Sequence, residues 1–105
     1  MLDANANVIK LDDEARALPG AWRSSVLGRA GTETVVKVVR MDATPLAEEQ
    51  HETPEALIVL DGRLRLRVAG RPVDVGAGEM YVVPAATPHA VLPGSRGTLL
   101  IVEAA

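Results

Sequence analysis

The feature that most restricts the fold is a series of short apolar segments that begins near residue 33. The segments are rich in β-branched residues or alternate in polarity, and Gly and Pro separate them. They are ETVVKVVRM (33–41), EALIVLD (55–61), RLRLRVA (63–69), PVDV (72–75), EMYVV (79–83), HAVL (89–92) and TLLIVE (98–103). This spacing is typical of an antiparallel all-β sandwich or barrel and leaves little room for helix.

Before residue 33 the β pattern weakens. The stretch LDDEARALPG (11–20) predicts one short helical turn, and SSVLG (24–28) predicts an edge strand. The chain has 105 residues and contains no internal repeat or linker. We therefore expect a single domain over 1–105, with a looser N-terminal arm at about 1–22.

Composition excludes several classes of function. A formal net charge of −3 offers no basic surface, so nucleic acid is not an expected partner. No apolar run approaches the roughly 20 residues of a membrane span, and the start resembles no signal peptide, so we expect a cytoplasmic protein with no membrane partner. The chain has no cysteine, so any metal must be held by nitrogen and oxygen. Because Trp22 and Tyr81 are the only aromatics, we expect a small aliphatic cavity.

The chain has two histidines, and both lie beside apolar segments. His51 stands in EEQHETPE (48–55), and His89 ends EMYVVPAATPH. In an extended chain Glu49, His51 and Glu55 would share one face, since side chains at even separations point the same way. With His89 from a later strand they make two imidazoles and one or two carboxylates. This ligand set suits iron, manganese, nickel or zinc.

Residues 43–93 resemble the two motifs of the cupin superfamily, G-x5-H-x-H-x3-4-E-x6-G and G-x5-P-x-G-x2-H-x3-N. The matching positions are His51, Glu55 and Gly62 in the first motif and Gly78, Pro84 and His89 in the second. Both histidines of the chain fall on motif positions. The resemblance implies an antiparallel cupin β-barrel, also called a jelly roll or double-stranded β-helix.

Four positions depart from the cupin motifs. Ala43 and Ala86 stand where the family has glycine, and Pro93 stands where it has asparagine. These changes affect turn geometry. Glu49 is the departure that bears on function, because it occupies the position of the first histidine of H-x-H.

The resemblance implies one divalent metal ion held by His51, Glu55 and His89, with Glu49 as an altered fourth ligand. Two alternatives stay open. Glu49 can instead belong to a solvated acidic run with Glu48 and Glu52. The histidines can also be structural, each hydrogen-bonded to a carboxylate with no metal.

The implied pocket lies beside this ligand set. We expect Leu57, Val59 and Val91 to line it. Lys37 and Arg40 are interpreted as the solvent face of a half-buried strand. Trp22 is interpreted as a core or dimer contact, or alternatively as a lid on the pocket.

Three functional hypotheses follow. The first is a metal-dependent enzyme, oxygenase-like or isomerase-like, that acts on a small polar molecule. The second is a binding or sensing cupin that holds a small ligand or metal without turnover. The third, a metal-free isomerase with a histidine as general base, is disfavoured by the lack of aromatics. A small barrel also leaves an apolar sheet face to cover, so we expect a homodimer.

Overall fold

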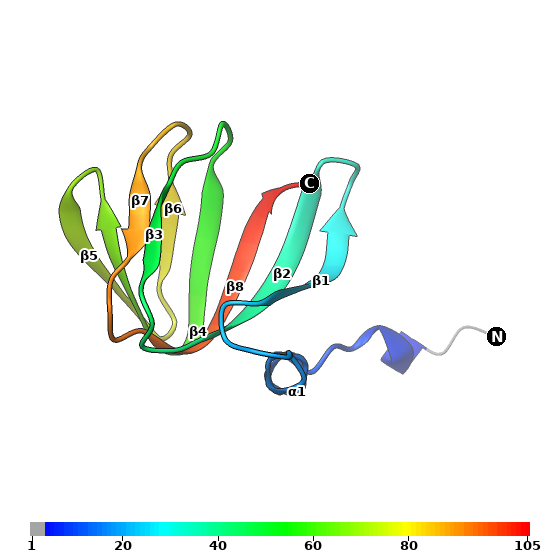
Figure 1. Ribbon diagram of the computed structural model, residues 1–105. Helices are drawn as coiled ribbons and strands as arrows, with labels where there is room; N and C mark the ends of the chain where they lie inside the picture. Colours follow the sequence, from blue (N-terminus) through cyan, green and yellow to red (C-terminus); the bar gives the residue numbers. More distant parts are fainter. Residues whose placement is uncertain (1–3) are drawn as a thin grey trace.

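A computed structural model describes residues 4–105, and its regular secondary structure is mostly β-strand (Figure 1). A 3-10 helix, η1 (Ala4–Asn7), and an α-helix, α1 (Leu11–Arg16), precede them. The strands are β1 (Ser24–Ala30), β2 (Thr34–Met41), β3 (Leu46–Glu49), β4 (Glu55–Val68), β5 (Arg71–Gly76), β6 (Met80–Val83), β7 (His89–Val91) and β8 (Arg96–Ala104). Residues 1–3 of the expected N-terminal arm lie outside the described residues.

The strands form one curled antiparallel sheet. Its order is β1-β2-β8-β4-β7-β3, and β5 and β6 also pair with β4. The curl places β1, β2 and β8 on one side of the molecule and β3, β5 and β7 on the other (Figure 1). The expected all-β jelly-roll fold is therefore confirmed. Strand β3 was not expected, because its sequence LAEE has no apolar alternation.

Strand β4 connects the two sides of the curled sheet. Its first part pairs with β6 and β8, and its second part pairs with β5 and β7. The two strands expected at 55–61 and 63–69 are thus one strand that bends at Gly62, where φ is +77°. A Cβ on Gly62 would lie 2.1 Å from the Arg96 carbonyl oxygen, so only glycine fits this close pairing with β8.

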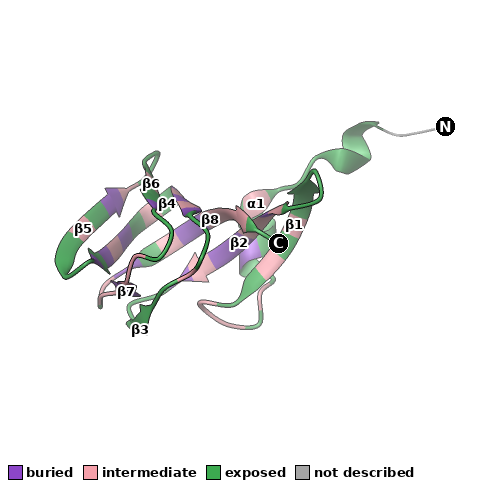
Figure 2. Ribbon diagram, turned by 90° about the horizontal axis from the view of Figure 1, so that it is seen from above, coloured by how far each residue is buried: buried purple, intermediate pink, exposed green. Residues whose placement is uncertain are grey.

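The alternation of side chains along β4 separates a core face from an outer face (Figure 2). Leu57, Leu64 and Leu66 point inward and are buried. On β6, Met80 and Val82 stay exposed at 59% and 48%. The expected homodimer, which such an apolar face would suit, stays a prediction.

Helix α1 packs against β2. Ala15 of the helix is buried, and Arg40 of β2 donates hydrogen bonds from Nη1 to the carbonyl oxygens of Ala15 (2.8 Å) and Leu18 (3.3 Å). Arg40 therefore anchors the end of the helix, and its interpretation as a solvent-face residue was wrong. Among residues 4–105, no helix is long and apolar enough to cross a membrane.

Candidate metal centre

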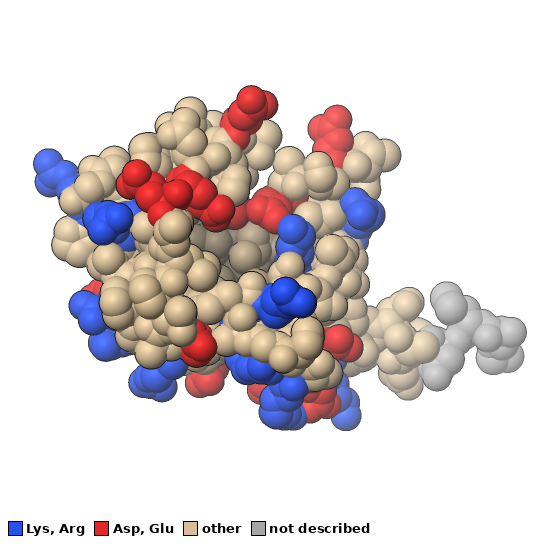
Figure 3. Space-filling model, viewed as in Figure 1, with Lys and Arg blue, Asp and Glu red and all other residues tan. Residues whose placement is uncertain are grey.

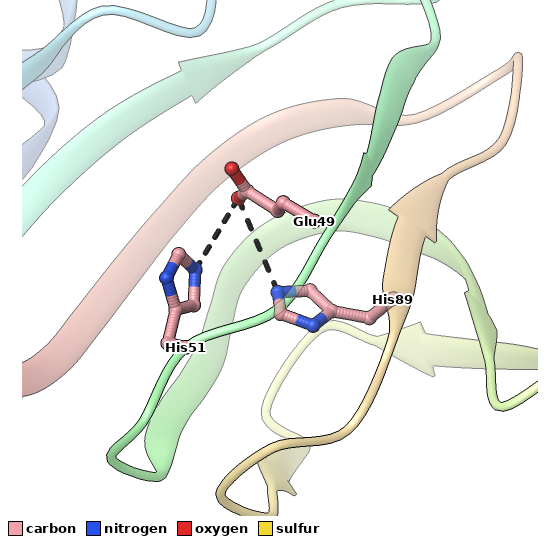
Figure 4. Close-up of side chains that lie close together, drawn as sticks. All are labelled: Glu49, His51 and His89. Carbon is pink, nitrogen blue, oxygen red and sulfur yellow. Dashed lines mark ion pairs between the residues drawn. The ribbon is translucent and has the colours of Figure 1, made fainter.

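Three strand ends bring the sequence-predicted ligands to one place (Figure 4). Glu49 is the last residue of β3 and pairs directly with His89, the first residue of β7. His51 follows β3 by two residues, and Glu55 begins β4. Because the chain turns between His51 and Glu55, these residues meet through strand pairing and not through the shared face of a single strand.

Glu49, His51 and His89 form the tightest group. One potential ligand atom from each lies within 4.8 Å of the others. Glu49 Oε1 is 3.4 Å from His51 Nε2 and 4.0 Å from His89 Nε2. The two imidazole rings are tilted, with their centroids 5.2 Å apart. Two ring nitrogens and one carboxylate oxygen thus converge on a small volume.

The ring of His89 is held in one orientation. Its Nδ1 lies 2.9 Å from the carbonyl oxygen of Thr87. Since a carbonyl oxygen only accepts, Nδ1 is the donor of this hydrogen bond, and in the neutral ring Nε2 then presents a lone pair. Within the described chain, this buried Nε2 has no hydrogen-bond partner, although Glu55 Oε1 lies 3.2 Å away. A metal-binding histidine usually donates its other ring N–H to a carbonyl or carboxylate in this way, which fixes its tautomer and its orientation.

Glu55 lies beside this group and is engaged elsewhere. It is buried, and its carboxyl group is hydrogen-bonded to that of Glu103 on β8. Burial raises the pKa of Glu55, and the hydrogen bond to Glu103 and the charge of Glu103 raise it further, against the attraction of the two imidazoles. The structure therefore places Glu55 next to the ligand group, with a carboxyl group that retains its proton more readily than a solvated one.

Glu103 in turn binds Lys37 of β2. Lys37 Nζ donates a hydrogen bond of 2.6 Å to Glu103 Oε1. Burial by itself would raise the pKa of Glu103, but the hydrogen bonds from Lys37 and Glu55 outweigh it and lower that pKa. The interpretation of Lys37 as a solvent-face residue was wrong, because its side chain lines the cavity.

Sequence reasoning missed Glu103, although a signal was present. In TLLIVE, Glu103 lies two and four residues after the apolar Ile101 and Leu99. Side chains at such even spacings point to the same face of a regular strand. Lys37 likewise lies two residues from both Val35 and Val39 and so shares their face of the strand. A charged residue in phase with a core face is a candidate for an internal pair, because burying it alone is costly.

The ligand group opens onto a cavity of about 190 Å³. Glu49, Glu55, Glu103 and His89 are among its lining residues, and most of the rest of the wall is aliphatic. Acidic side chains gather around the hollow between the two sides of the sheet (Figure 3). The cavity is therefore an apolar chamber with its charged groups at a few defined positions.

The three expected pocket residues have different places in the structure. Leu57 and Val91 line the cavity, whereas Val59 is fully buried in the core and does not. Trp22 also lines the cavity, and its indole Nε1–H donates a 2.9 Å hydrogen bond to Asp42. Asp42 has a lowered pKa, first because it accepts a hydrogen bond from the Thr44 backbone N–H.

Ala86 supports the outer part of the site. Its backbone N–H donates a 2.7 Å hydrogen bond to the carbonyl oxygen of His51. Its φ of +56° is the conformation expected of the glycine that it replaces. The substitution thus leaves the turn unchanged and puts an alanine into a conformation that glycine adopts at lower cost.

The donor set fits a divalent metal ion. His89 offers a buried, oriented nitrogen without a hydrogen-bond partner in the described part of the chain, and His51 and Glu49 add a nitrogen and an oxygen within reach. Neutral imidazole and carboxylate are the ligands preferred by iron, manganese, nickel and zinc. The expectation of a His/Glu group able to hold a metal is met by this arrangement.

Residues 38–102 match the family model described as Cupin domain, Cupin_2. A cupin-2 domain protein from Shewanella frigidimarina is similar in structure, with a TM-score of 0.88 and 23% identity over 98% of this chain and 100% of that one. A Neisseria meningitidis protein has a TM-score of 0.79 and 20% identity over 93% and 99% of the two chains. The DMSP lyase DddQ from Ruegeria pomeroyi has a TM-score of 0.68 and 23% identity over 79% of this chain and 46% of its own. No curated protein gives a match.

Proposed function

The chain belongs to the Cupin_2 family of cupin domains, and from this premise we propose that it is a metal-dependent enzyme acting on a small polar molecule. His51, His89 and Glu49 would hold one divalent ion, with Glu55 beside them. The observation that carries the proposal is His89 Nε2, which is buried, has no hydrogen-bond partner among the described residues, and belongs to a ring that the Thr87 carbonyl orients. An imidazole kept in this state for structural reasons alone would leave a polar atom without a partner.

The protein's own residues would have separate tasks. A bound divalent ion would act there as a Lewis acid or oxygen activator. The aliphatic walls exclude water from one side of the cavity, which strengthens every electrostatic interaction inside it. Glu55, whose Oε1 lies 3.2 Å from His89 Nε2, would retain its proton more readily than a solvated carboxyl group, because it is buried and Glu103 would accept a hydrogen bond from it. Glu55 is thus the group best placed to exchange a proton with a bound molecule.

Catalysis is supported more by the Glu55–Glu103 carboxyl pair than by the fold, because cupins host many activities. The similar structures include one named as a lyase, so a protein of this fold can be an enzyme. That name carries no substrate over to this chain. A metal-holding binding protein remains the second candidate, since the same cavity would serve it.

The first test is metal content. Protein purified without chelator or nickel affinity resin should contain close to one transition metal ion per chain, and the His51→Ala/His89→Ala variant should contain almost none. Elemental analysis with circular dichroism as a folding control makes the measurement. Equal and substoichiometric metal in both folded proteins would refute the proposal.

The second test separates enzyme from binder. Metal-loaded protein is incubated with small catechols, thiols, keto acids and hydroxy acids, while oxygen consumption and product formation are followed. Turnover that disappears in Glu55→Gln, with metal content retained, is the result expected of an enzyme. Ligand binding without turnover across the panel would favour the binding protein.

A further inference from the structure

The Lys37–Glu103 pair is an unusual feature for the inside of an apolar cavity. Both side chains line the cavity and are partly buried, with 28% and 22% of their surfaces exposed. They come from adjacent strands, β2 and β8, and Glu103 also interacts with Glu55, whose Oε1 lies 3.2 Å from His89 Nε2. The cavity therefore has a polar wall on which the ion pair lies beside the candidate metal centre.

Stability alone is a weak explanation for this ion pair. Strands β2 and β8 are already joined by an unbroken antiparallel register from Thr34–Ala104 to Met41–Gly97. A partly buried ion pair gains little net free energy, since desolvation offsets its Coulomb attraction, and an apolar pair of similar volume usually serves as well. A recognition role explains why both charges point into the cavity.

We propose that Lys37 and Glu103 form a subsite for a hydroxyl group, so that the ligand of this cavity is a small hydroxylated aliphatic molecule. The inference rests on the proposed function only for the other end of the ligand, which would face the metal centre. It names the substrate class that the proposed function leaves open.

The pair is complementary to a hydroxyl because it offers a donor and an acceptor side by side. A Lys ammonium has three N–H donors, and Lys37 gives one of them to Glu103 among the described contacts. The Glu103 carboxylate accepts from Lys37 and Glu55 and has lone pairs left. A hydroxyl oxygen can accept from Lys37 while its hydrogen is donated to Glu103.

Other ligand groups fit this position less well. A second carboxylate has no hydrogen to donate and would be repelled by Glu103. A methyl group would take water away from both charges without replacing its hydrogen bonds, and sites built for a hydroxyl strongly reject analogues that lack it.

The rest of the cavity sets the size and the polarity of the ligand. Its volume of about 190 Å³ is below the roughly 300 Å³ at which drug-sized sites begin. Leu57, Leu64, Leu66 and Leu99 belong to the aliphatic part of the lining. A small aliphatic molecule that carries oxygen atoms matches this lining.

The test compares three probes of equal chain length, namely 5-hydroxypentanoate, pentanoate and pentanedioate. Binding to zinc-loaded protein is followed by calorimetry and by the fluorescence of Trp22, the one tryptophan of the chain and a lining residue. We expect 5-hydroxypentanoate to bind at least about 10-fold more tightly than either other probe, as a hydrogen bond to charged groups implies.

Variants then locate the discrimination. Lys37→Met keeps the aliphatic stem, and Lys37→Met/Glu103→Gln also removes the charge that the first change leaves unpaired. Both should lose the preference for the hydroxyl while retaining zinc stoichiometry. Lys10→Met is the matched control, because Lys10 is the other lysine of the chain and is exposed. It should leave both zinc content and probe selectivity as they are.

Three results would overturn the inference: equal binding of pentanoate, tighter binding of pentanedioate, or binding of none of the probes. Retention of the preference in the folded double variant would do so as well. Zinc stoichiometry, measured separately, reports on the proposed function. Should zinc fail to bind, the probe ratio in the zinc-free protein still decides the hydroxyl subsite.

Discussion

The candidate metal centre has an inner half, His89 and Glu55, and a rim half, Glu49 and His51. The side chains of the inner half are 6% and 10% exposed, whereas those of the rim half are 62% and 39% exposed. The inner residues begin β7 and β4, which pair within the sheet, but the rim residues lie at the end of the short edge strand β3 and in the loop after it. Side chains of the same chemical type are thus enclosed by the protein to very different degrees.

The difference in burial between the two halves indicates which residues are positioned before any metal binds. The inner half is fixed by strand pairing, by the Thr87 carbonyl and by the carboxyl group of Glu103. In the rim half, Glu49 pairs with His89 at the end of the edge strand β3, and the His51 carbonyl oxygen accepts one backbone hydrogen bond from Ala86. The exposed side chains of both residues can exchange their contacts with water. We expect the inner half to determine affinity and the rim half to adjust it.

The comparison is tested most strongly at the two histidines. His89→Ala should weaken zinc binding by at least about 100-fold, because it removes the pre-oriented nitrogen, whereas His51→Ala should weaken it by about 10-fold. Competition with a chromophoric chelator measures both affinities. Equal losses for the two variants would contradict the distinction between inner and rim halves.

The next effect concerns Glu49. Replacing its carboxylate in Glu49→Gln should lower zinc affinity by about 10-fold if it is a ligand of the rim half. Glu48→Gln is the matched control, since Glu48 is the preceding exposed residue of β3. The zinc affinity of this variant should stay within about twofold of that of the unmodified protein. A response of Glu49→Gln no larger than that of Glu48→Gln would assign Glu49 to the solvated acidic run.

A third prediction tests the inner half without metal. Because the pKa of Glu55 is raised on folding, the native state binds more protons than the unfolded state above pH 4.5, the ordinary value. The free energy of unfolding therefore contains a contribution that is complete at low pH and is lost as pH rises through the raised pKa. The lowered pKa of Glu103 acts in the opposite sense, below pH 4.5.

Glu55→Gln cannot ionise, so chelator-treated Glu55→Gln should lose less stability than the unmodified protein between pH 5 and pH 8. Urea unfolding at both pH values measures the difference. The exposed Glu52→Gln variant should behave like the unmodified protein. Parallel pH dependence for Glu55→Gln and the unmodified protein would show that burial does not hold a proton on Glu55.

The smallest effect is expected at the turn that supports the rim. Ala86→Gly should raise the free energy of unfolding by about 0.5–1 kcal/mol, since relief of the positive φ exceeds the entropic cost of glycine. Zinc affinity should not change, because the backbone N–H that binds His51 is retained. Ala85→Gly, in the same turn without a positive φ, should destabilise the protein, and a gain there would refute the explanation.

Much of the fold was predictable because it is encoded locally. The period-2 pattern of Leu64, Leu66 and Val68 fixes which face of β4 is buried, and Gly and Pro mark most of the turns. The continuous path of β4 through Gly62 was not predictable, because it depends on the close pairing with Gly97 of β8. Local patterns carry no information about a strand that changes partners.

By itself the sequence determined the family, the antiparallel β-fold and the two histidines as candidate metal ligands, because residue type, spacing and alternation are local properties. Only the tertiary structure decided that Glu55 is engaged by Glu103 while Glu49 approaches both imidazoles. It also brought Lys37 into the cavity. These partners lie far apart in the sequence, and strand pairing and burial alone determine which charges meet.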